Sequence, residues 1–313
     1  MEYKQLGNTG LKASVAGLGC GGHSRLGLFS RGMDNAAGIV RHAYEQGVNF
    51  FDTAYNYGTH PAVAKGLSGI PRDRYLLSSK FPPQTDTGDL RASAELEVIL
   101  DESLRALQTD YLDIWHLHGV LPDLYPDIRD RFLPELVRMR DKGKIRFIGI
   151  TEMFGTDTRH EMLGQALQND GWDVVMVGHS LLNPSAAKKI LPMAAKRGIG
   201  TLCMFAVRSA LSNPEQLKRD VRKMADAGQI SMEWAGQDGV LDFLVENGHS
   251  KTIMEAAYRY CRHTKGLDVI LTGTSDVGHL ADNLASILMP PLPEAARTRL
   301  DKLFGQVDCV SGQ

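Results

Sequence analysis

The stretch Gly19-Cys20-Gly21-Gly22-His23 decides between two α/β folds for this chain of 313 residues. It ends the first short apolar run of the sequence, residues 16–20. An open, doubly wound sheet that binds a dinucleotide normally has the spacing G-x-G-x-x-G between its first strand and helix. Read from Gly19, the third glycine of that spacing is missing, because Ser24 stands in its place. The stretch therefore favours a closed parallel barrel.

Seven more short apolar runs follow, and segments with helical periodicity separate most of them. The predicted strands are residues 16–20, 48–52, 75–79, 111–117, 145–151, 173–177, 200–205 and 268–272. The clearest predicted helices are residues 89–107, 215–227, 250–263 and 294–304. Parallel strands need a crossover between them, and the intervening helices supply it. Eight such units in about 250 residues are typical of a (β/α)8 TIM barrel, which we predict.

Two features lie outside the regular repeat. At the start, the extended runs 3–6 and 11–15 flank Gly7-Asn8-Thr9-Gly10, which predicts a β-hairpin. After the seventh strand, residues 207–249 are predicted to be an insertion, because this interval is too long for one loop and one helix. Its position after a strand predicts that it lies over the active-site face of the barrel. We predict one domain, residues 1–313, with a mobile polar end after residue 304.

Composition excludes several classes of protein. Lys and Arg number 35 against 37 Asp and Glu, for a net charge of −2, and no basic tail is present, so a nucleic-acid partner is not expected. The four cysteines form no C-x-x-C pair, which excludes a disulfide framework and a zinc site and indicates reduced thiols. No apolar run approaches the roughly 20 residues that cross a bilayer, and no signal peptide opens the chain. We predict a cytoplasmic protein without a membrane partner or a metal; the sequence carries no sign of oligomeric state.

Titratable side chains gather at the predicted strand ends. Asp52 ends the second strand, Lys80 follows the third, and His118 lies at the end of the fourth. Tyr57 lies in the loop that follows Asp52. Taken singly, each is more often a helix cap, a surface group or part of the core. Because the carboxyl ends of barrel strands converge on one pocket, we expect the four to meet there.

Their chemistry suits proton transfer to a carbonyl oxygen. The ordinary pKa of a tyrosine is about 10, and a buried Lys80 ammonium beside Tyr57 is expected to lower it. Lys80 needs a carboxylate to stay charged in a pocket, and Asp52 is available. His118 is placed to donate a hydrogen bond to the substrate oxygen. None of these groups supplies a hydride, so a hydride-carrying cofactor is implied.

Three segments resemble the catalytic segments of the aldo-keto reductases: Asp52-Thr53-Ala54-x-x-Tyr57-Gly58, Ser79-Lys80-Phe81 and Tyr111-Leu112-Asp113-x-x-x-x-His118. The opening Leu6-Gly7-x-Thr9-Gly10-Leu11 is similar to the family's N-terminal hairpin, and Gly273-Thr274-Ser275 with Leu280-x-Asp282-Asn283 to its nucleotide-binding segment. The resemblance spans nearly the whole chain in the right order. It implies a barrel oxidoreductase that uses NAD or NADP, with Asp52, Tyr57, Lys80 and His118 as catalytic residues. His116, on the same strand, is the fallback for His118.

The cofactor contacts that the resemblance implies include three departures from the family pattern. The implied residues are Gly21, Gly22, Asp52, Thr151, Glu152, Met176, Met204, Phe205, Arg208, Gly273, Thr274, Ser275, Asp276, His279, Asp282 and Asn283. The family usually has Asn at Glu152, Gln at Met176, and Tyr or Trp at Met204. An ionised Glu152 cannot donate to the nicotinamide carbonyl, and a methionine is a softer surface than an aromatic ring. We therefore predict an altered nicotinamide contact.

The choice between NAD and NADP depends on the last of these segments. A 2′-phosphate is bound by Arg or Lys, whereas a free ribose hydroxyl suits an acidic partner. Residues 273–279 contain neither Arg nor Lys, and Asp276 would repel a phosphate, so the segment favours NAD. Arg208 is a candidate for the pyrophosphate, with a plain surface arginine as the alternative.

The substrate is expected to be small. Tyr55, Phe81 and His179 are the predicted substrate contacts, and His23 also lies in a loop that can line the mouth. Polar groups among aromatic ones suit a sugar or polyol; a simple aldehyde or ketone fits nearly as well.

The predicted function is hydride transfer between the cofactor and an aldehyde, ketone or sugar, with Tyr57 as general acid/base. A regulatory subunit that binds a nicotinamide nucleotide with little catalysis is the alternative, to which the altered contacts point. A barrel hydrolase or lyase is disfavoured, because neither a metal-ligand spacing nor a pair of glycosidase-like carboxylates is present.

Overall fold

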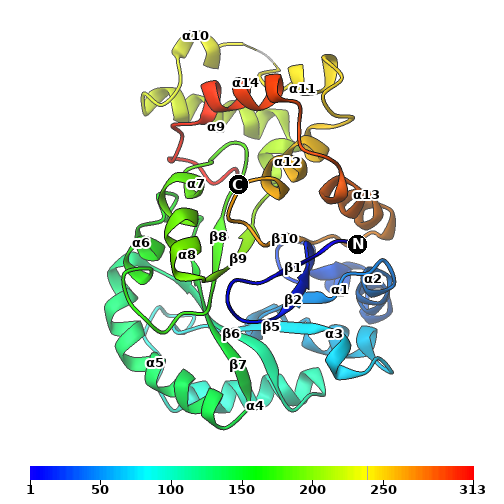
Figure 1. The fold of residues 1–313 in the computed structure, drawn as a ribbon, viewed down its shortest axis with the longest axis vertical. Helices are drawn as coiled ribbons and strands as arrows, with labels where there is room; N and C mark the ends of the chain where they lie inside the picture. Colours follow the sequence, from blue (N-terminus) through cyan, green and yellow to red (C-terminus); the bar gives the residue numbers. More distant parts are fainter. Residues whose placement is uncertain (238) are drawn as a thin grey trace.

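The computed structural model describes residues 1–237 and 239–313, and a closed barrel of parallel strands lies at its centre (Figure 1). The strands are β3 (Ala16–Gly19), β4 (Phe50–Asp52), β5 (Leu76–Phe81), β6 (Leu112–Val120), β7 (Ile145–Glu152), β8 (Val174–Gly178), β9 (Gly200–Met204) and β10 (Val269–Thr272). Each pairs with the next along the chain, and β10 closes the barrel on β3. All eight predicted strands are present, and the predicted TIM barrel is confirmed.

The glycines of β3 serve the interior of the barrel. Counted from Gly17, the chain does contain the spacing G-x-G-x-x-G, ending at Gly22. Gly17, however, lies inside the strand, where a Cβ atom would come within 2.8 Å of the Leu271 side chain and 3.1 Å of Phe50. This spacing therefore reflects close packing inside a barrel and not the phosphate-binding turn of a doubly wound sheet.

Helices cover the outside of the barrel (Figure 1). They are α1 (Leu28–Arg31), α2 (Met33–Glu45), α3 (His60–Leu67), α4 (Glu95–Leu107), α5 (Tyr125–Asp141), α6 (Glu161–Ala166), α7 (Ala186–Lys189), α8 (Leu191–Arg197), α12 (Ile253–Arg262) and α13 (Val277–Leu288). The predicted helix over residues 89–107 begins only at Glu95, because a bridge between Gln84 and Leu90 and the hydrogen bond from Arg91 N to Pro83 O hold a turn before it. None of the helices in the described residues is long and apolar enough to cross a membrane.

The predicted N-terminal hairpin is confirmed and closes the amino end of the barrel. It consists of β1 (Tyr3–Gln5) and β2 (Lys12–Ser14), paired antiparallel. Leu6 and Leu11 are buried in one cluster with inward side chains such as Phe50 and Ile114. The turn approaches the barrel so closely that a Cβ atom on Gly7 would lie 2.3 Å from the Gly200 nitrogen. The opposite, carboxyl end is therefore the end left for a site.

The interval after β9 forms a second packed layer. It contains a 3-10 turn, η5 (Ser209–Leu211), and the helices α9 (Pro214–Asp226), α10 (Met232–Ala235) and α11 (Phe243–Glu246); position 238 of the predicted insertion lies outside the described residues. Figure 1 shows these helices together with α14 (Glu294–Phe304) at one end of the molecule. Their apolar faces share a buried cluster that includes Leu211, Met224, Leu244 and Phe304.

The end of the chain packs against this layer, so the prediction of a mobile polar end was wrong. Val307 and Val310 are buried in the same cluster. The Gly312 carbonyl accepts a hydrogen bond from the Ala210 nitrogen, and Asn183 Nδ2 donates to the Val310 carbonyl. Two apolar side chains among the polar residues of this segment are enough to hold it.

We predict that truncating the hairpin's buried leucine destabilises the barrel. Leu6 is fully buried, so Leu6→Ala removes packed methyl groups and should lower the free energy of unfolding by about 2–5 kcal/mol. The matched control is Leu288→Ala in α13, where the side chain is 43% exposed and the loss should be small. Urea denaturation measures both. Equal losses for the two variants would contradict the role assigned to the hairpin.

Candidate active site

Alternation along the strands turns polar side chains into the carboxyl end of the barrel. Lys80 of β5 lies beside His116 of β6, and Ser78 lies beside Asp52 of β4. Residues two apart on a strand face the same side, so His118 also points inward. Three neighbouring strands thus bring an acid, a base and two imidazoles to one place, as the sequence predicted.

A buried ion pair between Lys80 and Asp52 forms the centre of this group. Lys80 Nζ donates to Asp52 Oδ2 at 2.6 Å and to the Thr53 carbonyl at 2.6 Å. The two residues are only 1% and 4% exposed. Burial alone would lower the pKa of Lys80, but Asp52 and Tyr57 outweigh it and the pKa rises above its ordinary value. The pair with Asp52 therefore favours the charged form of Lys80 inside the barrel.

Tyr57 lies beside the Lys80 ammonium. The 3-10 turn η2 (Tyr55–Tyr57) follows β4 and ends at Gly58, whose φ of +73° favours glycine. Tyr57 Oη lies 3.3 Å from His118 Nε2, and Lys80 Nζ lies 5.0 Å from the centre of the Tyr57 ring. A Cβ atom on Gly21 would come within 2.3 Å of the same ring. The structure thus brings the four predicted catalytic residues together.

The expected direction of the Tyr57 pKa was wrong. Burial raises the pKa of the phenol above its ordinary value, and the opposing effect of Lys80 is smaller. Burial also lowers the pKa of His118 to about 3, with Lys80 adding to the effect. At neutral pH the site therefore presents a protonated phenol beside a neutral imidazole.

His116 supports the acid and does not reach the phenol. Ser78 Oγ donates its hydrogen to Asp52 Oδ1 at 2.8 Å. His116 Nε2 lies 3.1 Å from Ser78 Oγ and therefore acts as the donor in that contact. The ring has room because its neighbour on β7 is Gly149, where a Cβ atom would lie 2.1 Å from Nδ1. The contact with Tyr57 favours His118 over His116 as the fourth catalytic residue. Within the described residues, no group of three or more His, Cys, Asp or Glu is placed to hold a metal ion.

The predicted nucleotide-binding segment follows β10 on the same rim. Asp276 caps α13 by accepting from the His279 nitrogen, and Arg31 Nη1 donates to Asp276 Oδ2 at 3.4 Å and to the Ser275 carbonyl at 3.1 Å. The segment itself contains neither Arg nor Lys, but Arg31 reaches it from a helix 244 residues earlier. This cation offsets the repulsion of a phosphate expected from Asp276, so the segment no longer favours NAD over NADP.

The remaining residues of this segment differ in exposure. Thr274 is buried, and Asn283 donates to Thr272 Oγ1 at 3.0 Å. Gly273, His279 and Asp282 are exposed on the rim and on α13. Gly22, in the loop after β3, is exposed as well, with a φ of +70°.

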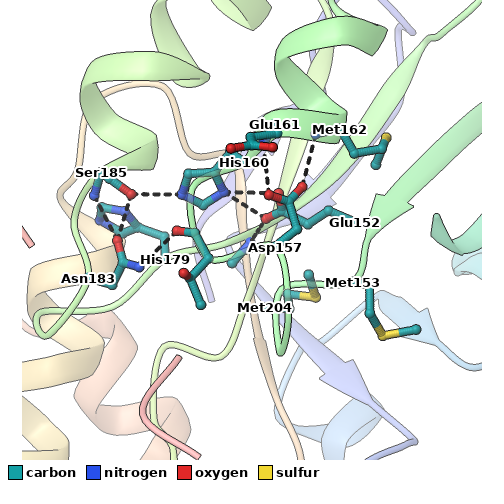
Figure 2. A network of polar contacts seen from close by, with 12 residues as sticks. Glu152, Met153, Asp157, His160, Glu161, Met162, His179, Asn183, Ser185 and Met204 are labelled. Carbon is teal, nitrogen blue, oxygen red and sulfur yellow. Dashed lines mark hydrogen bonds and ion pairs between the residues drawn. The ribbon is translucent and has the colours of Figure 1, made fainter. Parts of the chain in front are cut away.

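The three altered positions lie on the neighbouring strands β7, β8 and β9. Met176 and Met204 belong to the cluster of inward side chains, and Thr151 Oγ1 accepts from the Gly119 nitrogen at 2.7 Å. Glu152 is fully engaged elsewhere: its carboxylate binds His160 Nδ1 at 2.9 Å and the Gly178 nitrogen at 2.7 Å (Figure 2). The structure therefore ties Glu152 to its own chain, and a nicotinamide contact by this side chain is not favoured.

The predicted substrate residues are not gathered in one place. Phe81 is fully buried between the barrel and α5, with its ring 5.0 Å from that of Phe132, so it faces away from Lys80. His179 is buried, stacks on Tyr260 at 5.8 Å and bonds Thr264 through Nε2. Tyr55 alone is partly exposed on the turn that carries Tyr57, and its hydroxyl donates to Glu102.

Comparison with known proteins gives one consistent result. The model of the Aldo/keto reductase family matches residues 22–304. L-galactose dehydrogenase of Arabidopsis thaliana is 28% identical over 297 residues, which cover 92% of this chain and 88% of the relative. Aldo-keto reductase YhdN of Bacillus subtilis is 26% identical, with 90% and 87% covered. Aldo-keto reductase AKR11C1 of Bacillus halodurans, in its holo form, matches the fold with a TM-score of 0.73 at 23% identity, over 99% of this chain and 98% of that one.

We predict that removing only one partner of the Lys80–Asp52 ion pair strongly lowers the free energy of unfolding. Lys80→Met leaves the Asp52 carboxylate buried without its cation and should lower the free energy of unfolding by about 3–5 kcal/mol. The double variant Asp52→Asn/Lys80→Met should recover part of that loss. Lys65→Met, which breaks an exposed ion pair with Asp34, is the matched control, and its effect should be much smaller. Urea denaturation of the four proteins decides, and a Lys80→Met loss no larger than that of the control would contradict the assignment.

We also predict that His118 does not titrate near neutral pH. Because burial lowers its pKa to about 3, the imidazole should stay neutral from about pH 5 to pH 8. NMR titration of the histidine ring protons, with His118→Asn to assign the signal, measures this. A midpoint near the ordinary value of about 6.5 would show that the ring is solvated and would refute the buried arrangement.

Proposed function

Because the chain belongs to the aldo/keto reductase family, we propose that it transfers hydride between a nicotinamide cofactor, NAD or NADP, and a carbonyl or alcohol group, with Tyr57 as general acid/base. The observation that carries the proposal is the contact of Tyr57 Oη with His118 Nε2 beside the buried Lys80–Asp52 pair. Membership of the family supports an oxidoreductase; the cofactor and the roles of the residues are our assignment.

In the direction of reduction, each residue has a separate task. The raised pKa of Tyr57 keeps the phenol protonated, which is the state that gives a proton to the substrate oxygen. The Lys80 ammonium stabilises the phenolate that remains, and Asp52 keeps that ammonium in place. Neutral His118 orients the oxygen by hydrogen bonding as negative charge develops. The cofactor, when bound, supplies or accepts the hydride.

The residues on the rim fit a dinucleotide. Arg208, directly after β9, is partly buried and its Nε atom has no hydrogen-bond partner among the described residues, so a cation is available for phosphate. The turn from β10 to α13 presents the partly exposed Ser275, while the N-terminus of α13 is already capped by Asp276. Gly21 and Gly22 leave the loop beside Tyr57 without side chains. Both NAD and NADP remain candidates, because Arg31 lies beside Asp276.

The substrate we propose is an aldehyde, a ketone or a sugar. One relative of similar length is named L-galactose dehydrogenase, which supports a hydroxylated substrate for this chain too. Of the predicted substrate contacts we retain Tyr55, because it is partly exposed and lies on the same turn as Tyr57, although its hydroxyl donates to Glu102. We treat residues 1–313 as one domain in which the segment 207–249 borders the active-site face.

Nucleotide titration followed by turnover tests the proposal. NADH and NADPH are titrated separately, and the nucleotide that binds is then used with a panel of sugars, aldehydes and ketones. Binding with turnover supports an enzyme, whereas binding without turnover on the whole panel would favour a regulatory nucleotide-binding subunit. If neither nucleotide binds, the proposed function is refuted.

We predict that Tyr57→Phe retains nucleotide affinity but lowers kcat by about 10²–10⁴-fold, because it removes only the transferred proton. Steady-state kinetics on the substrate found in the panel measures the effect. Tyr3→Phe on the hairpin, 41% exposed, is the matched control and should behave as wild type. Near-normal turnover by Tyr57→Phe would exclude this phenol as the proton donor.

A further inference from the structure

Glu152, which stands where the family has an asparagine, belongs to a buried chain of hydrogen bonds. Glu152 and His160 are both buried, and the Glu152 carboxylate accepts from His160 Nδ1 (Figure 2). His160 Nε2 lies 3.0 Å from Ser185 Oγ, whose own hydrogen goes to Asn183 Oδ1 at 2.6 Å. His160 Nε2 therefore donates to Ser185, and Nδ1 shares a hydrogen with the Glu152 carboxyl group, so both ring nitrogens are held.

An aromatic stack leads from the His160 ring to Phe205 and Arg208. The ring of His160 stacks on Phe154 with centres 5.2 Å apart and an angle of 14° between their planes. Phe154 lies 6.0 Å from Phe205, and the Arg208 guanidinium lies 3.6 Å from the centre of the Phe205 ring. Gly178 leaves the room for Phe154, because a Cβ atom there would lie 2.2 Å from its ring.

The backbone is strained at both ends of this stack. His160 has a φ of +63° and Phe205 a φ of +68°, in the left-handed region that side chains other than glycine rarely adopt. Such conformations cost free energy and persist where the surroundings require them, often at ligand sites. The strain indicates that the positions of these two rings matter beyond packing.

Arg208, at the end of the stack, has no anion of its own. Across the residues that the structure describes, it makes no ion pair, and its buried Nε has no hydrogen-bond partner. Burial lowers the pKa of Arg208 to about 10, so the cation is held under an unfavourable desolvation that an anionic ligand would relieve. A guanidinium with free N–H groups on a ring is suited to bidentate binding of phosphate oxygens.

Contacts at the chain end place Arg208 on the same mouth as Tyr57. A Cβ atom on Gly312 would lie 3.3 Å from the Arg208 side chain, and Gln313 Nε2 lies 2.8 Å from His23 Nε2. His23 follows Gly21, which packs against the Tyr57 ring. A ligand that extends from Tyr57 across the mouth of the barrel therefore comes near the Arg208 side chain.

We propose that the Glu152–His160 pair is a positioning device that, through Phe154 and Phe205, holds Arg208 to bind the pyrophosphate of the nucleotide. The inference rests on the proposed function. The nucleotide is the chosen source of the anion because the proposed substrates, aldehydes, ketones and sugars, carry no charge. The family binds the nicotinamide with the asparagine at this position. In this proposal Glu152, which replaces it, instead helps to bind the phosphates by positioning Arg208.

The first test removes the cation. Arg208→Met should raise the Kd of the nucleotide by about 10–100-fold, the effect of charged hydrogen bonds worth about 1.5–3 kcal/mol. Fluorescence titration is done without substrate, with reduced nicotinamide riboside, which carries no phosphate, as the matched ligand; its affinity should change little. The control variant is Arg299→Met, whose guanidinium lies 4.0 Å from the centre of the Phe243 ring in the second layer.

The second test asks whether the stack acts through Arg208. Phe154→Leu breaks the stack without touching the ion pair, and His160→Gln breaks the pair; both should raise KM for the nucleotide and leave kcat unchanged at saturation. Combined with Arg208→Met, neither should add a further loss, whereas a merely structural role would give additive losses. If His160→Gln does not fold, the Phe154→Leu cycle alone decides.

The outcomes separate this inference from the proposed function. If wild type binds neither NADH nor NADPH, the proposed function fails. If wild type binds but Arg208→Met behaves as Arg299→Met, or raises only the KM of the substrate, the inference is overturned and the proposed function stands. Additive losses in the double variants would overturn the positioning role of Glu152 and His160.

Discussion

The buried ion pair of Lys80 and Asp52 is the constraint on which the rest of the site depends. An ammonium and a carboxylate leave water only when each has the other and further hydrogen bonds, which Thr53 and Ser78 provide. Once that pair is fixed, its field acts on every neighbour. Burial is the larger influence on the protonation of Tyr57 and His118; the Lys80 cation adds to it at His118 and opposes it at Tyr57.

The two sides of the barrel mouth differ in the side chains that point inward. On the side of β4, β5 and β6, Asp52, Lys80 and His118 point inward and make polar contacts with one another or with Tyr57. On the side of β7, β8 and β9, methionines face inward and the polar groups turn outward into the Glu152–His160 pair. The fold tolerates this exchange because the strand ends are held by backbone pairing, which does not depend on the identity of the side chains.

Patterns that repeat along the chain could be predicted, and contacts between distant segments could not. The eight strands and the meeting of Asp52, Tyr57, Lys80 and His118 follow from alternation and strand ends. The approach of Arg31 to Asp276, and the pairing of Glu152 with His160, depend on side-chain directions that no local pattern contains. The direction of the Tyr57 pKa shift was missed because burial and a nearby cation oppose each other, and only the structure shows which is larger.

The central claim, direct hydride exchange at a carbon next to Tyr57, is tested by following the hydride itself. Reduced nucleotide with both hydrogens at the nicotinamide C4 position replaced by deuterium is incubated with the protein and the best carbonyl substrate in ordinary water, and the product is analysed by mass spectrometry. The account predicts one deuterium on the former carbonyl carbon and none on the oxygen, whose proton comes from Tyr57. Product formed without deuterium on that carbon would contradict it.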